Sequence, residues 1–456
     1  MAEESFELPE HAFRRRDTLK ESITRDHASD RPAAPAAAAD PDGSVFMAAA
    51  GALVLVALAL GGLGLGAGLA RGADCGAAKP CGCGDRIIED YEMTGSLGPC
   101  LGDGLRLAAG VVLDGKGFAI RGAGQKSGLV LDERSHGARV RNIEVTGFHH
   151  GLRMAGVRAA RIDNLRAHHN GNAERHTGYG IDFARGASDN VLVGVHIHEN
   201  ADEGIHFGPA ASRNQVAGSE IYDNYRENIY FLENSGNVVR GSVLRGGGAA
   251  AAYIKHAPGT RLVGNRIEGR PVQLRGRSDG VVLSGNTLHG AAILLQPLGG
   301  AAPQDVRIEG GAIHPSGGAC VRVHGSRGVV VQDVDLDCRP ALSVDAGARV
   351  TVRGATTVRV QCRGMGEVKL AAPSGLRFVD TAGAGVAGVR IHDAEGRLLA
   401  ESDAAGALGT DLPFEVIRCP GRAAGMPRLV ASLGAWSMAL LPSSLRSGVV
   451  LVPAAR

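Results

Sequence analysis

The sequence predicts an all-β fold, a parallel β-helix in which each repeat forms one coil of a solenoid. Four short segments between residues 178 and 256 can be aligned, and their central residues lie 24, 24 and 25 positions apart: Ile181, Ile205, Ile229 and Ile254. Gly or Asn separates these segments, and the chain has 68 glycines but only 4% aromatic residues. Such a period, with strands this short, is typical of a solenoid.

Side chains alternate between the two faces of a strand, so the isoleucines should fill the bore while the residue after each one faces water. The same register extends to the neighbouring repeats. The outward residues, in chain order, are Arg106, Val130, Arg153, Asp182, His206, Tyr230, Lys255, Gln273, Leu294, Arg322 and Ser343. The six polar ones from Arg153 to Gln273 should form a row about 24 Å long, at about 4.8 Å per coil. A row of this length suits a polymer.

The first 70 residues predict a membrane anchor. Residues 1–44 are charged and rich in Ala and Pro, and we expect them to be disordered. Residues 45–70 form an uncharged run of 26 residues, long enough to cross a bilayer as one helix. The long charged leader favours an uncleaved signal-anchor, although Gly68-Leu-Ala70 could serve as a cleavage site.

Half of the eight cysteines follow this run, within residues 71–103, which we interpret as a linker and N-terminal cap. Disulfides and a zinc site are the two alternatives for Cys75, Cys81, Cys83 and Cys100. The spacings fit no usual zinc pattern, and disulfides form in oxidising compartments. We therefore expect a single-pass protein whose C-terminal bulk is extracytoplasmic, either periplasmic or extracellular.

The start of the predicted solenoid carries recognisable segments: Cys83-Gly-Asp85, Cys100, Gly104-Leu-Arg-Leu107, Val112-Leu-Asp-Gly-Lys-Gly117 and Ile120-Arg-Gly122. They resemble bacterial right-handed parallel β-helix proteins of the pectin-lyase-like superfamily. The resemblance runs from about residue 83 to residue 362 and implies a right-handed solenoid over residues 104–363, with a Cys83–Cys100 disulfide holding its cap. Since that superfamily includes lyases, hydrolases, epimerases and copper-site accessory proteins, it selects no single activity.

A second resemblance is local. Tyr179-Gly-Ile-Asp182 resembles the Tyr-Gly-Phe-Asp start of the catalytic motif in mannuronan C5-epimerases, which act on alginate with this fold. Their motif continues with Pro-His, whereas Phe183-Ala184 follow here. The resemblance therefore implies catalytic roles for Tyr179 and Asp182 alone.

The outward row holds the residue types needed to remove the C5 proton of a uronic acid. That reaction needs a cation for the carboxylate, a base near C5 and an acid. Arg153 and Lys255 could supply the cation, His206 or a tyrosine the base and acid, and Asp182 would orient His206. The predicted catalytic residues are Arg153, Tyr179, Asp182, His206, Tyr230 and Lys255. The predicted substrate-binding residues are Glu203, Arg226, Glu227, Tyr253 and Gln273. Five of the six tyrosines lie between residues 178 and 256, and exposed rings offer faces on which sugars stack.

We therefore expect a membrane-anchored protein that binds an acidic polysaccharide and modifies it as a lyase or epimerase. A non-catalytic surface, adhesion or metal-handling β-helix is one alternative. A glycoside hydrolase is another, since Glu203 and Glu227 occupy equivalent positions on neighbouring coils and such enzymes use paired carboxylates. A net charge of +2 argues against a nucleic-acid partner, and no cofactor is expected.

Histidine is concentrated in the same region, with eight of 16 between His149 and His206. His168, His196 and His198 are candidate ligands for copper or zinc. The alternative, an exposed polar face, needs no metal, and the predicted site contains none.

Two further features predict scaffold. Asn170, Asn200 and Asn224 share one turn position, and Asn190, Asn214 and Asn237 share another, so we expect stacked, hydrogen-bonded amides. Cys338 and Cys362 should lie on adjacent coils, bridged or simply packed. After residue 363 the register is lost, and residues 364–456 predict a small immunoglobulin-like β-sandwich with Asp-x-x-Gly turns.

Overall fold

The computed structural model describes residues 72–354, 358–371, 376–409, 412–420, 422–424, 428–441, 443, 445 and 449–452. The predicted disordered segment, residues 1–44, and the predicted membrane span, residues 45–70, lie outside these ranges. Among the residues that are described, no helix has the length and apolar character needed to cross a bilayer.

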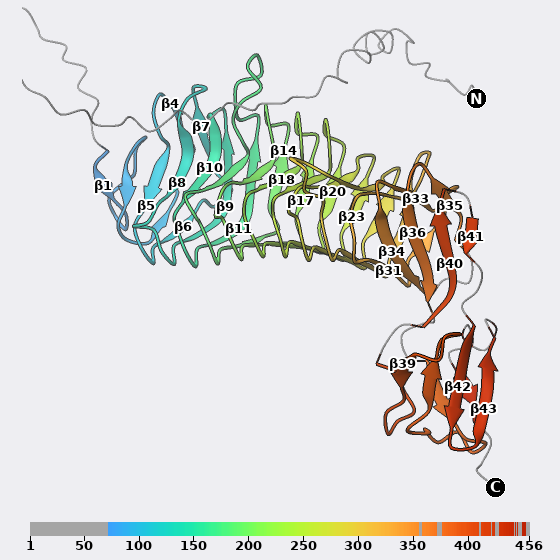
Figure 1. The fold of residues 1–456 in the computed structure, drawn as a ribbon. Coiled ribbons are helices and arrows are strands. Elements are labelled where there is room, and N and C mark those ends of the chain that lie inside the picture. The colour runs from blue at the N-terminus through green and yellow to red at the C-terminus, as the bar shows by residue number, and fades with distance from the viewer. Residues whose placement is uncertain are drawn as a thin grey trace, which may run out of the picture. The chain divides into compact units, whose positions relative to one another are not determined.

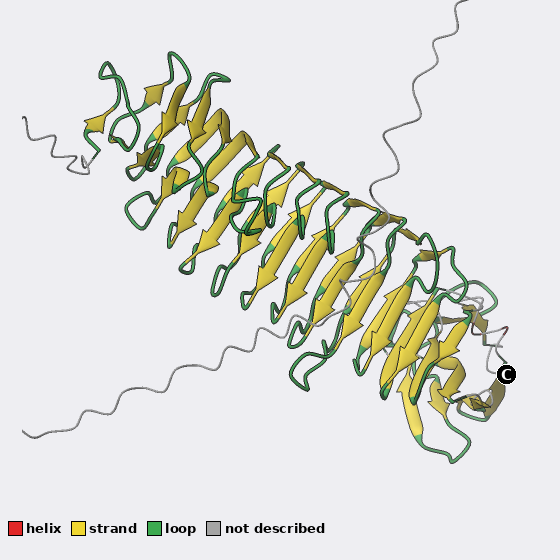
Figure 2. Ribbon diagram, turned by 90° about the horizontal axis from the view of Figure 1, so that it is seen from above, coloured by secondary structure: helices red, strands yellow, loops and turns green. Residues whose placement is uncertain are grey.

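The described chain is built from short strands that stack coil upon coil as a parallel β-helix (Figures 1 and 2). One face is a parallel sheet of fourteen described strands. In spatial order they are β1 (Asp74–Cys75), β2 (Arg86–Ile87), β5 (Leu105–Leu107), β8 (Ser127–Leu131), β10 (His150–Ala155), β12 (Ile181–Ala184), β15 (Ile205–Phe207), β18 (Ile229–Leu232), β21 (Ala252–Lys255), β24 (Val272–Arg275), β27 (Ile293–Gln296), β30 (Val321–His324), β33 (Leu342–Asp345) and β35 (Val360–Cys362). We call this face the main sheet.

The rest of each coil contributes two more strands, joined in the long strands β9 (Arg139–Thr146) and β11 (Arg161–His168) and separate elsewhere. The first file contains β3 (Tyr91–Glu92), β6 (Val112–Asp114), β13 (Val191–Val193), β16 (Gln215–Ala217), β19 (Val238–Arg240), β22 (Arg261–Val263), β25 (Val282–Ser284), β28 (Arg307–Glu309), β31 (Val329–Gln332), β34 (Ala348–Arg353) and β36 (Gly366–Ala371). The second contains β4 (Leu97–Cys100), β7 (Ala119–Gly122), β14 (His196–His198), β17 (Glu220–Tyr222), β20 (Val243–Arg245), β23 (Arg266–Glu268), β26 (Thr287–His289), β29 (Ala312–His314) and β32 (Asp335–Leu336).

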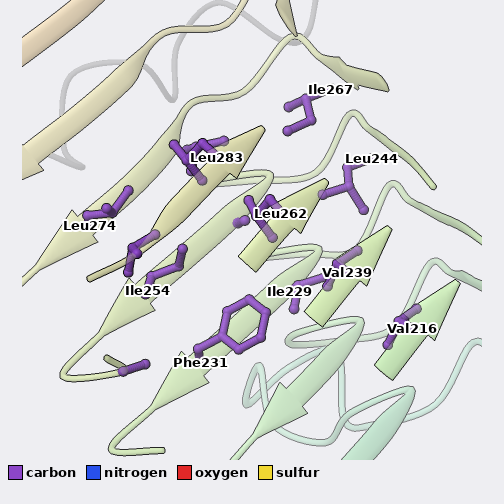
Figure 3. Close-up of a cluster of buried hydrophobic side chains, with 14 of the residues drawn as sticks. Val216, Ile229, Phe231, Val239, Leu244, Ile254, Leu262, Ile267, Leu274 and Leu283 are labelled. Atoms are coloured by element: carbon purple, nitrogen blue, oxygen red, sulfur yellow. The ribbon is translucent and has the colours of Figure 1, made fainter. Parts of the chain in front are cut away.

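The bore is filled by the inward residues of all three strand files. Phe183 stacks on Phe207 with ring centroids 4.5 Å apart, and Phe207 on Phe231 at 4.8 Å. Figure 3 shows Ile229 and Val239 pointing into the same apolar core from different strands. Every coil repeats this burial, so the period of the apolar residues dictates the fold. Each Å² of apolar surface removed from water stabilises the folded chain by about 25 cal/mol.

Stacked asparagines fix the turns, as the sequence predicts. Nδ2 of Asn170 donates to Oδ1 of Asn200 (3.0 Å), and Nδ2 of Asn200 donates to Oδ1 of Asn224 (2.9 Å). Asn190, Asn214 and Asn237 repeat the pattern at a second turn. These amides also bind backbone carbonyls, so the buried turns keep their polar groups satisfied.

All eight cysteines are paired. Cys83 bridges to Cys100, the pairing that the resemblance implies, and Cys75 bridges to Cys81 in the same cap. Cys338 and Cys362, expected on adjacent coils, instead bond to Cys320 and Cys419 respectively. The two bridges of the cap replace the zinc alternative for the four N-terminal cysteines.

The parallel ladder continues beyond residue 363, because β36 still pairs in parallel with β34. β40 (Pro413–Cys419) then pairs with β36 in the antiparallel sense, and β41 (Arg422–Ala424) pairs with β40. Four further strands form an antiparallel sheet: β39 (Leu398–Glu401), β38 (Arg390–His392), β42 (Leu429–Leu433) and β43 (Trp436–Leu440). β37 (Arg377–Val379) pairs with β44 (Val449–Leu451). An immunoglobulin-like sandwich stays a prediction for this region.

Candidate functional site

The outward row of the main sheet begins as the sequence predicts. Arg153 pairs with Asp182, Asp182 with His206, and His206 with Tyr230 on successive coils. The backbone register alone therefore brings these four side chains into one row.

The predicted row is wrong at its next member. Ile229 pairs with Ala252 and Tyr230 with Tyr253, so Lys255 does not follow Tyr230. The coil from Tyr230 to Tyr253 has a step of 23 residues, whereas aligning Ile229 with Ile254 assumed 25. A shift of two residues keeps Lys255 outward-facing but moves it to a parallel row, opposite Arg275. The 23-residue step from Asn214 to Asn237 was the signal that could have revealed this shorter coil.

Asp182 connects a cation and an imidazole across three coils. Its Oδ1 lies 3.0 Å from Nδ1 of His206, and its Oδ2 lies 3.6 Å from Nε of Arg153. Asp182 is only 6% exposed, so water screens these contacts little. A carboxylate at Asp182 accepts the Nδ1 proton of His206, which leaves Nε2 of His206 as the basic nitrogen.

Five rings follow one another along the main sheet, some stacked and some tilted. The centroid distances are 5.1 Å for His150–Tyr179, 4.5 Å for Tyr179–His206, 5.7 Å for His206–Tyr230 and 5.2 Å for Tyr230–Tyr253. The outer pairs, His150–Tyr179 and Tyr230–Tyr253, are stacked, whereas the two contacts of His206 are tilted by 33° and 39°. Stacking of sugars on these rings, expected from the sequence, stays a prediction.

Tyr179 is held over His206 by a loop that the neighbouring coils lack. The step from Leu152 to Ile181 is 29 residues, against 24 for the next coil, and the extra residues form the hairpin Gly171–Gly178. Gly178 has φ of +103°, and a Cβ there would lie 2.2 Å from the carbonyl oxygen of His149, so no other residue fits without rearrangement.

This hairpin forms one wall of an open pocket of about 570 Å³. The pocket contains Tyr179, Asp182 and His206 of the predicted set and lacks Tyr230 and Lys255. Residues that sequence reasoning missed also line it: His149, His150, Arg185 and Asp202. The one sequence signal for these residues was the longer coil, because it takes Tyr179 and its flanking turns out of the regular repeat.

The pKa values of the pocket residues separate their roles. Burial lowers the pKa of His150 to about 4, so its imidazole is neutral at physiological pH. The backbone N–H of Tyr179 donates to Nδ1 of His150 (3.3 Å), which assigns the remaining proton to Nε2. Burial, reinforced by the Glu203 charge, raises the pKa of the Tyr179 hydroxyl, which stays a phenol. Burial and the neighbouring Tyr253 raise the pKa of the Tyr230 hydroxyl as well.

Three carboxyl groups gather around one guanidinium beside the pocket. Nη1 of Arg226 lies 3.4 Å from Asp202 Oδ1 and 3.5 Å from Glu203 Oε1, and its Nε lies 3.7 Å from Glu227 Oε2. Burial raises the pKa of Glu203 to about 8, with the Asp202 charge adding to the effect, and it raises the pKa of Glu227 and Asp202 as well.

This cluster corrects the predicted roles of Glu203 and Glu227. They are 2% and 4% exposed, so they offer almost no surface to a sugar, either as binding residues or as the carboxylate pair of a hydrolase. Each lies in the turn before a main-sheet strand, where side chains do not alternate between buried and exposed as they do within the strand. Arg226 is engaged with the same carboxyls rather than free for a substrate.

A comparison with family models agrees with this architecture. The family model described as "Right handed beta helix region" matches residues 127–288. The chain is a right-handed parallel β-helix repeat protein. No curated protein matches its sequence.

Several solved structures are similar to this β-helix protein. The Dettilon tailspike protein has a TM-score of 0.43 at 14% identity, covering 76% of this chain and 73% of that one. An alginate lyase from Paenibacillus sp. has a TM-score of 0.34 at 17% identity, covering 60% and 99%. The A-module of a mannuronan C-5 epimerase from Azotobacter vinelandii has a TM-score of 0.30 at 13% identity, covering 62% and 79%.

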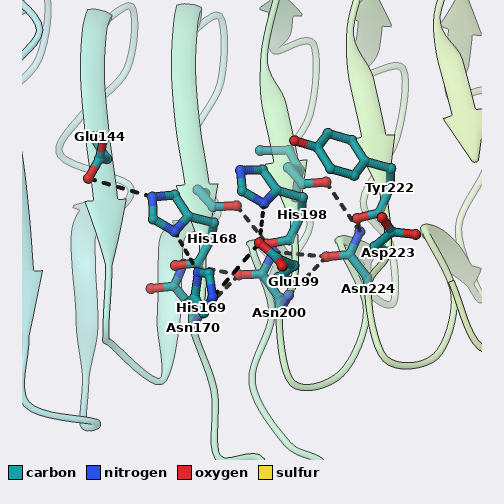
Figure 4. Close-up of polar contacts among 12 residues, drawn as sticks. Glu144, His168, His169, Asn170, His198, Glu199, Asn200, Tyr222, Asp223 and Asn224 are labelled. Carbon is teal, nitrogen blue, oxygen red and sulfur yellow. Dashed lines mark hydrogen bonds and ion pairs between the residues drawn. The ribbon is translucent and has the colours of Figure 1, made fainter. Parts of the chain in front are cut away.

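The second strand file of the β-helix carries the predicted histidine cluster (Figure 4). His168 stacks on His198 at 4.9 Å, and His198 stacks on Tyr222 at 4.7 Å. Each imidazole has a carboxylate neighbour: His168 lies 3.5 Å from Glu144, and His198 lies 2.9 Å from Glu199.

His196 pairs with Arg166 rather than with His168, so the three histidines do not converge. Within the described ranges, no group of three or more His, Cys, Asp or Glu could hold a metal ion. The described side chains of this face form a series of stacked rings with carboxylate neighbours.

Proposed function

We propose that this protein binds an acidic polysaccharide across the main sheet and removes the C5 proton of a uronate at His206, as a lyase or an epimerase. One observation carries the proposal. A buried carboxylate, Asp182, orients His206 at the floor of an open pocket, and the Tyr179 hydroxyl, kept as a phenol, belongs to the same pocket.

The geometry suggests a role for each group. Nε2 of His206 takes the C5 proton while Asp182 stabilises the imidazolium that forms. Tyr179 donates a proton, either to the leaving oxygen in elimination or to the opposite face of the sugar in epimerisation. Arg185 lines the pocket, and no described carboxylate forms an ion pair with it, so it is the best-placed cation for the uronate carboxylate. Arg153 acts through Asp182.

A membrane-anchored, extracytoplasmic location is part of the proposal. Its support is the uncharged run at residues 45–70 together with the pairing of all eight cysteines, which is typical of an oxidising compartment. Expressed full-length protein should stay with membranes after alkaline carbonate washing and dissolve in detergent. Protease added outside the cytoplasmic membrane should digest the β-helix region. Protection from that protease would contradict the location.

The activity can be tested with the full-length protein and a panel of uronate polymers. Absorbance near 230 nm reports the unsaturated product of a lyase, and deuterium uptake from solvent at C5 reports an epimerase. We expect one of these signals with at least one polymer, and its loss in His206→Gln. His324→Gln is a matched control, because His324 also faces an aspartate, Asp345, on the next coil (3.4 Å) but lies outside the pocket.

A non-catalytic polysaccharide-binding protein is the second candidate. It is favoured by the series of ring contacts from Tyr179 to Tyr253, which could hold a sugar chain without any chemistry. If wild-type protein binds a uronate polymer but gives neither signal, and His206→Gln binds it equally well, this candidate replaces the enzyme.

A further inference from the structure

The shorter coil that moved Lys255 out of the first row creates a second outward row beside it. In this row Leu232 pairs with Lys255, and Lys255 pairs with Arg275. Lys255 and Arg275 therefore lie on adjacent coils, about 4.8 Å apart along the axis. Both side chains are half-buried.

These two cations have no carboxylate partner among the residues that the structure describes. Arg213 and Arg226, on other coils, form ion pairs with aspartate or glutamate. In the described chain, no carboxylate lies within the ion-pair distance of 4.0 Å from Lys255 or Arg275. Nε of Arg275 is in addition shielded from solvent without an acceptor. The charge of the Arg275 guanidinium is therefore not neutralised within the described chain, which favours an anionic ligand beside it.

A tyrosine hydroxyl completes the group. Nη1 of Arg275 donates to the hydroxyl oxygen of Tyr253 at 3.4 Å, and the Tyr253 ring stacks on Tyr230 at 5.2 Å. Tyr253 therefore connects the two cations to the row that leads back to His206. It lies two coils beyond His206, about 10 Å along the axis.

We propose that Tyr253, Lys255 and Arg275 form a second carboxylate-binding subsite, which holds another uronate unit of the chain whose reacting unit lies in the pocket. This inference rests on the proposed function, because it assumes a uronate polymer. The two cations bind the carboxylate, and the Tyr253 hydroxyl contacts the sugar.

The charge distribution along the row favours binding of the polyanion at the subsite rather than at the pocket. The pocket end of the row carries Asp182 and the Asp202–Glu203–Glu227 cluster, whose cations are already engaged. A polyanion gains little there beyond Arg185. Two uncompensated cations farther along hold the chain electrostatically and leave the pocket to the chemistry. The protein should therefore require an oligomer with more than one uronate unit.

The test measures binding by calorimetry, with full-length protein in detergent and three probes: a mannuronate hexamer, a galacturonate hexamer and a carboxyl-reduced, neutral hexamer. The double variant Lys255→Met/Arg275→Met removes both charges and keeps an unbranched, apolar side chain at each position. We expect it to bind the preferred uronate hexamer about tenfold or more weakly than wild type, and to lose much of the salt dependence of binding. The neutral hexamer should bind equally to both proteins. Arg322→Met, another outward arginine on a later coil, should behave as wild type.

The outcomes separate the two proposals. If the double variant binds a uronate hexamer as tightly as wild-type protein does, the subsite is overturned and the proposed function stands. Wild-type protein that binds neither uronate hexamer would overturn both. If the double variant binds the neutral hexamer more weakly than wild type but has the same thermal unfolding midpoint, the loss comes from sugar contacts other than the carboxylate. That result would also overturn the subsite.

Discussion

Asp182 lies directly opposite His206 on the next coil, with its Oδ1 3.0 Å from Nδ1 of the imidazole. Both residues sit at paired positions of a parallel sheet, so the backbone itself fixes their contact. A chain that places an acid and an imidazole one period apart obtains an oriented base without any dedicated loop. The reactivity of His206 should therefore depend on Asp182.

Asp182→Asn should lower turnover of a uronate substrate by about 10²-fold or more, because an amide neither stabilises the imidazolium nor fixes one tautomer of His206. Steady-state kcat on the preferred polymer measures this. Asp345→Asn, which changes the His324 partner on a later coil, is the matched control and should have no effect. Turnover of Asp182→Asn within twofold of wild type would remove Asp182 from the mechanism.

Tyr179→Phe should reduce kcat by about 10²-fold with little change in KM, because it removes the acid and keeps the ring, whose centroid lies 4.5 Å from that of His206. Tyr222→Phe, on the second strand file, serves as the control. An active Tyr179→Phe beside an inactive Tyr230→Phe would show that the acid had been assigned to the wrong tyrosine.

Glu203 should make stability fall as pH rises. Its pKa is about 8 in the folded chain, where burial dominates, and about 4.5 in the unfolded chain. The folded state therefore binds the proton more tightly, so this contribution is complete below pH 4.5 and is lost as the pH rises through 8. Glu203→Gln keeps the neutral shape and should recover stability at pH 9, on the order of a few kcal/mol.

Urea unfolding midpoints at pH 5 and pH 9 measure this effect. The exposed Glu174→Gln is the control and should leave the difference between the two pH values unchanged. A Glu203→Gln protein that loses as much stability as wild type between pH 5 and pH 9 would show that Glu203 holds no extra proton in the folded state.

Asn200→Ala should destabilise the solenoid by about 2–3 kcal/mol. Asn200 is buried, donates to the carbonyl oxygens of Ala167 and His198 and to Asn224, and accepts from Asn170. Alanine leaves these buried groups unsatisfied. Gln215→Ala, an exposed position, should change the urea midpoint little. Equal effects of the two substitutions would contradict a structural role for the asparagine ladder.

The sequence predicted the coils well because each coil of a solenoid contacts only its neighbours. The alignment of Ile181, Ile205 and Ile229 therefore predicted both the stacking and the alternation of inward and outward side chains. It failed at Ile254, where Gly246, Gly247 and Gly248 blur the turn and a coil of different length fits the same pattern of isoleucines.

The sequence by itself determined the solenoid, the asparagine ladders and the contact between Asp182 and His206, since all three follow from a repeat whose period is local. Only the tertiary structure decided which polar groups are usable. Glu203 and Tyr230 look equally polar in the sequence, yet the carboxyl is buried in a turn and the phenol is half-exposed on a strand. His150, Arg185 and Asp202 reach the pocket from coil edges whose paths depend on an inserted hairpin, and no periodic pattern specifies how such a segment packs.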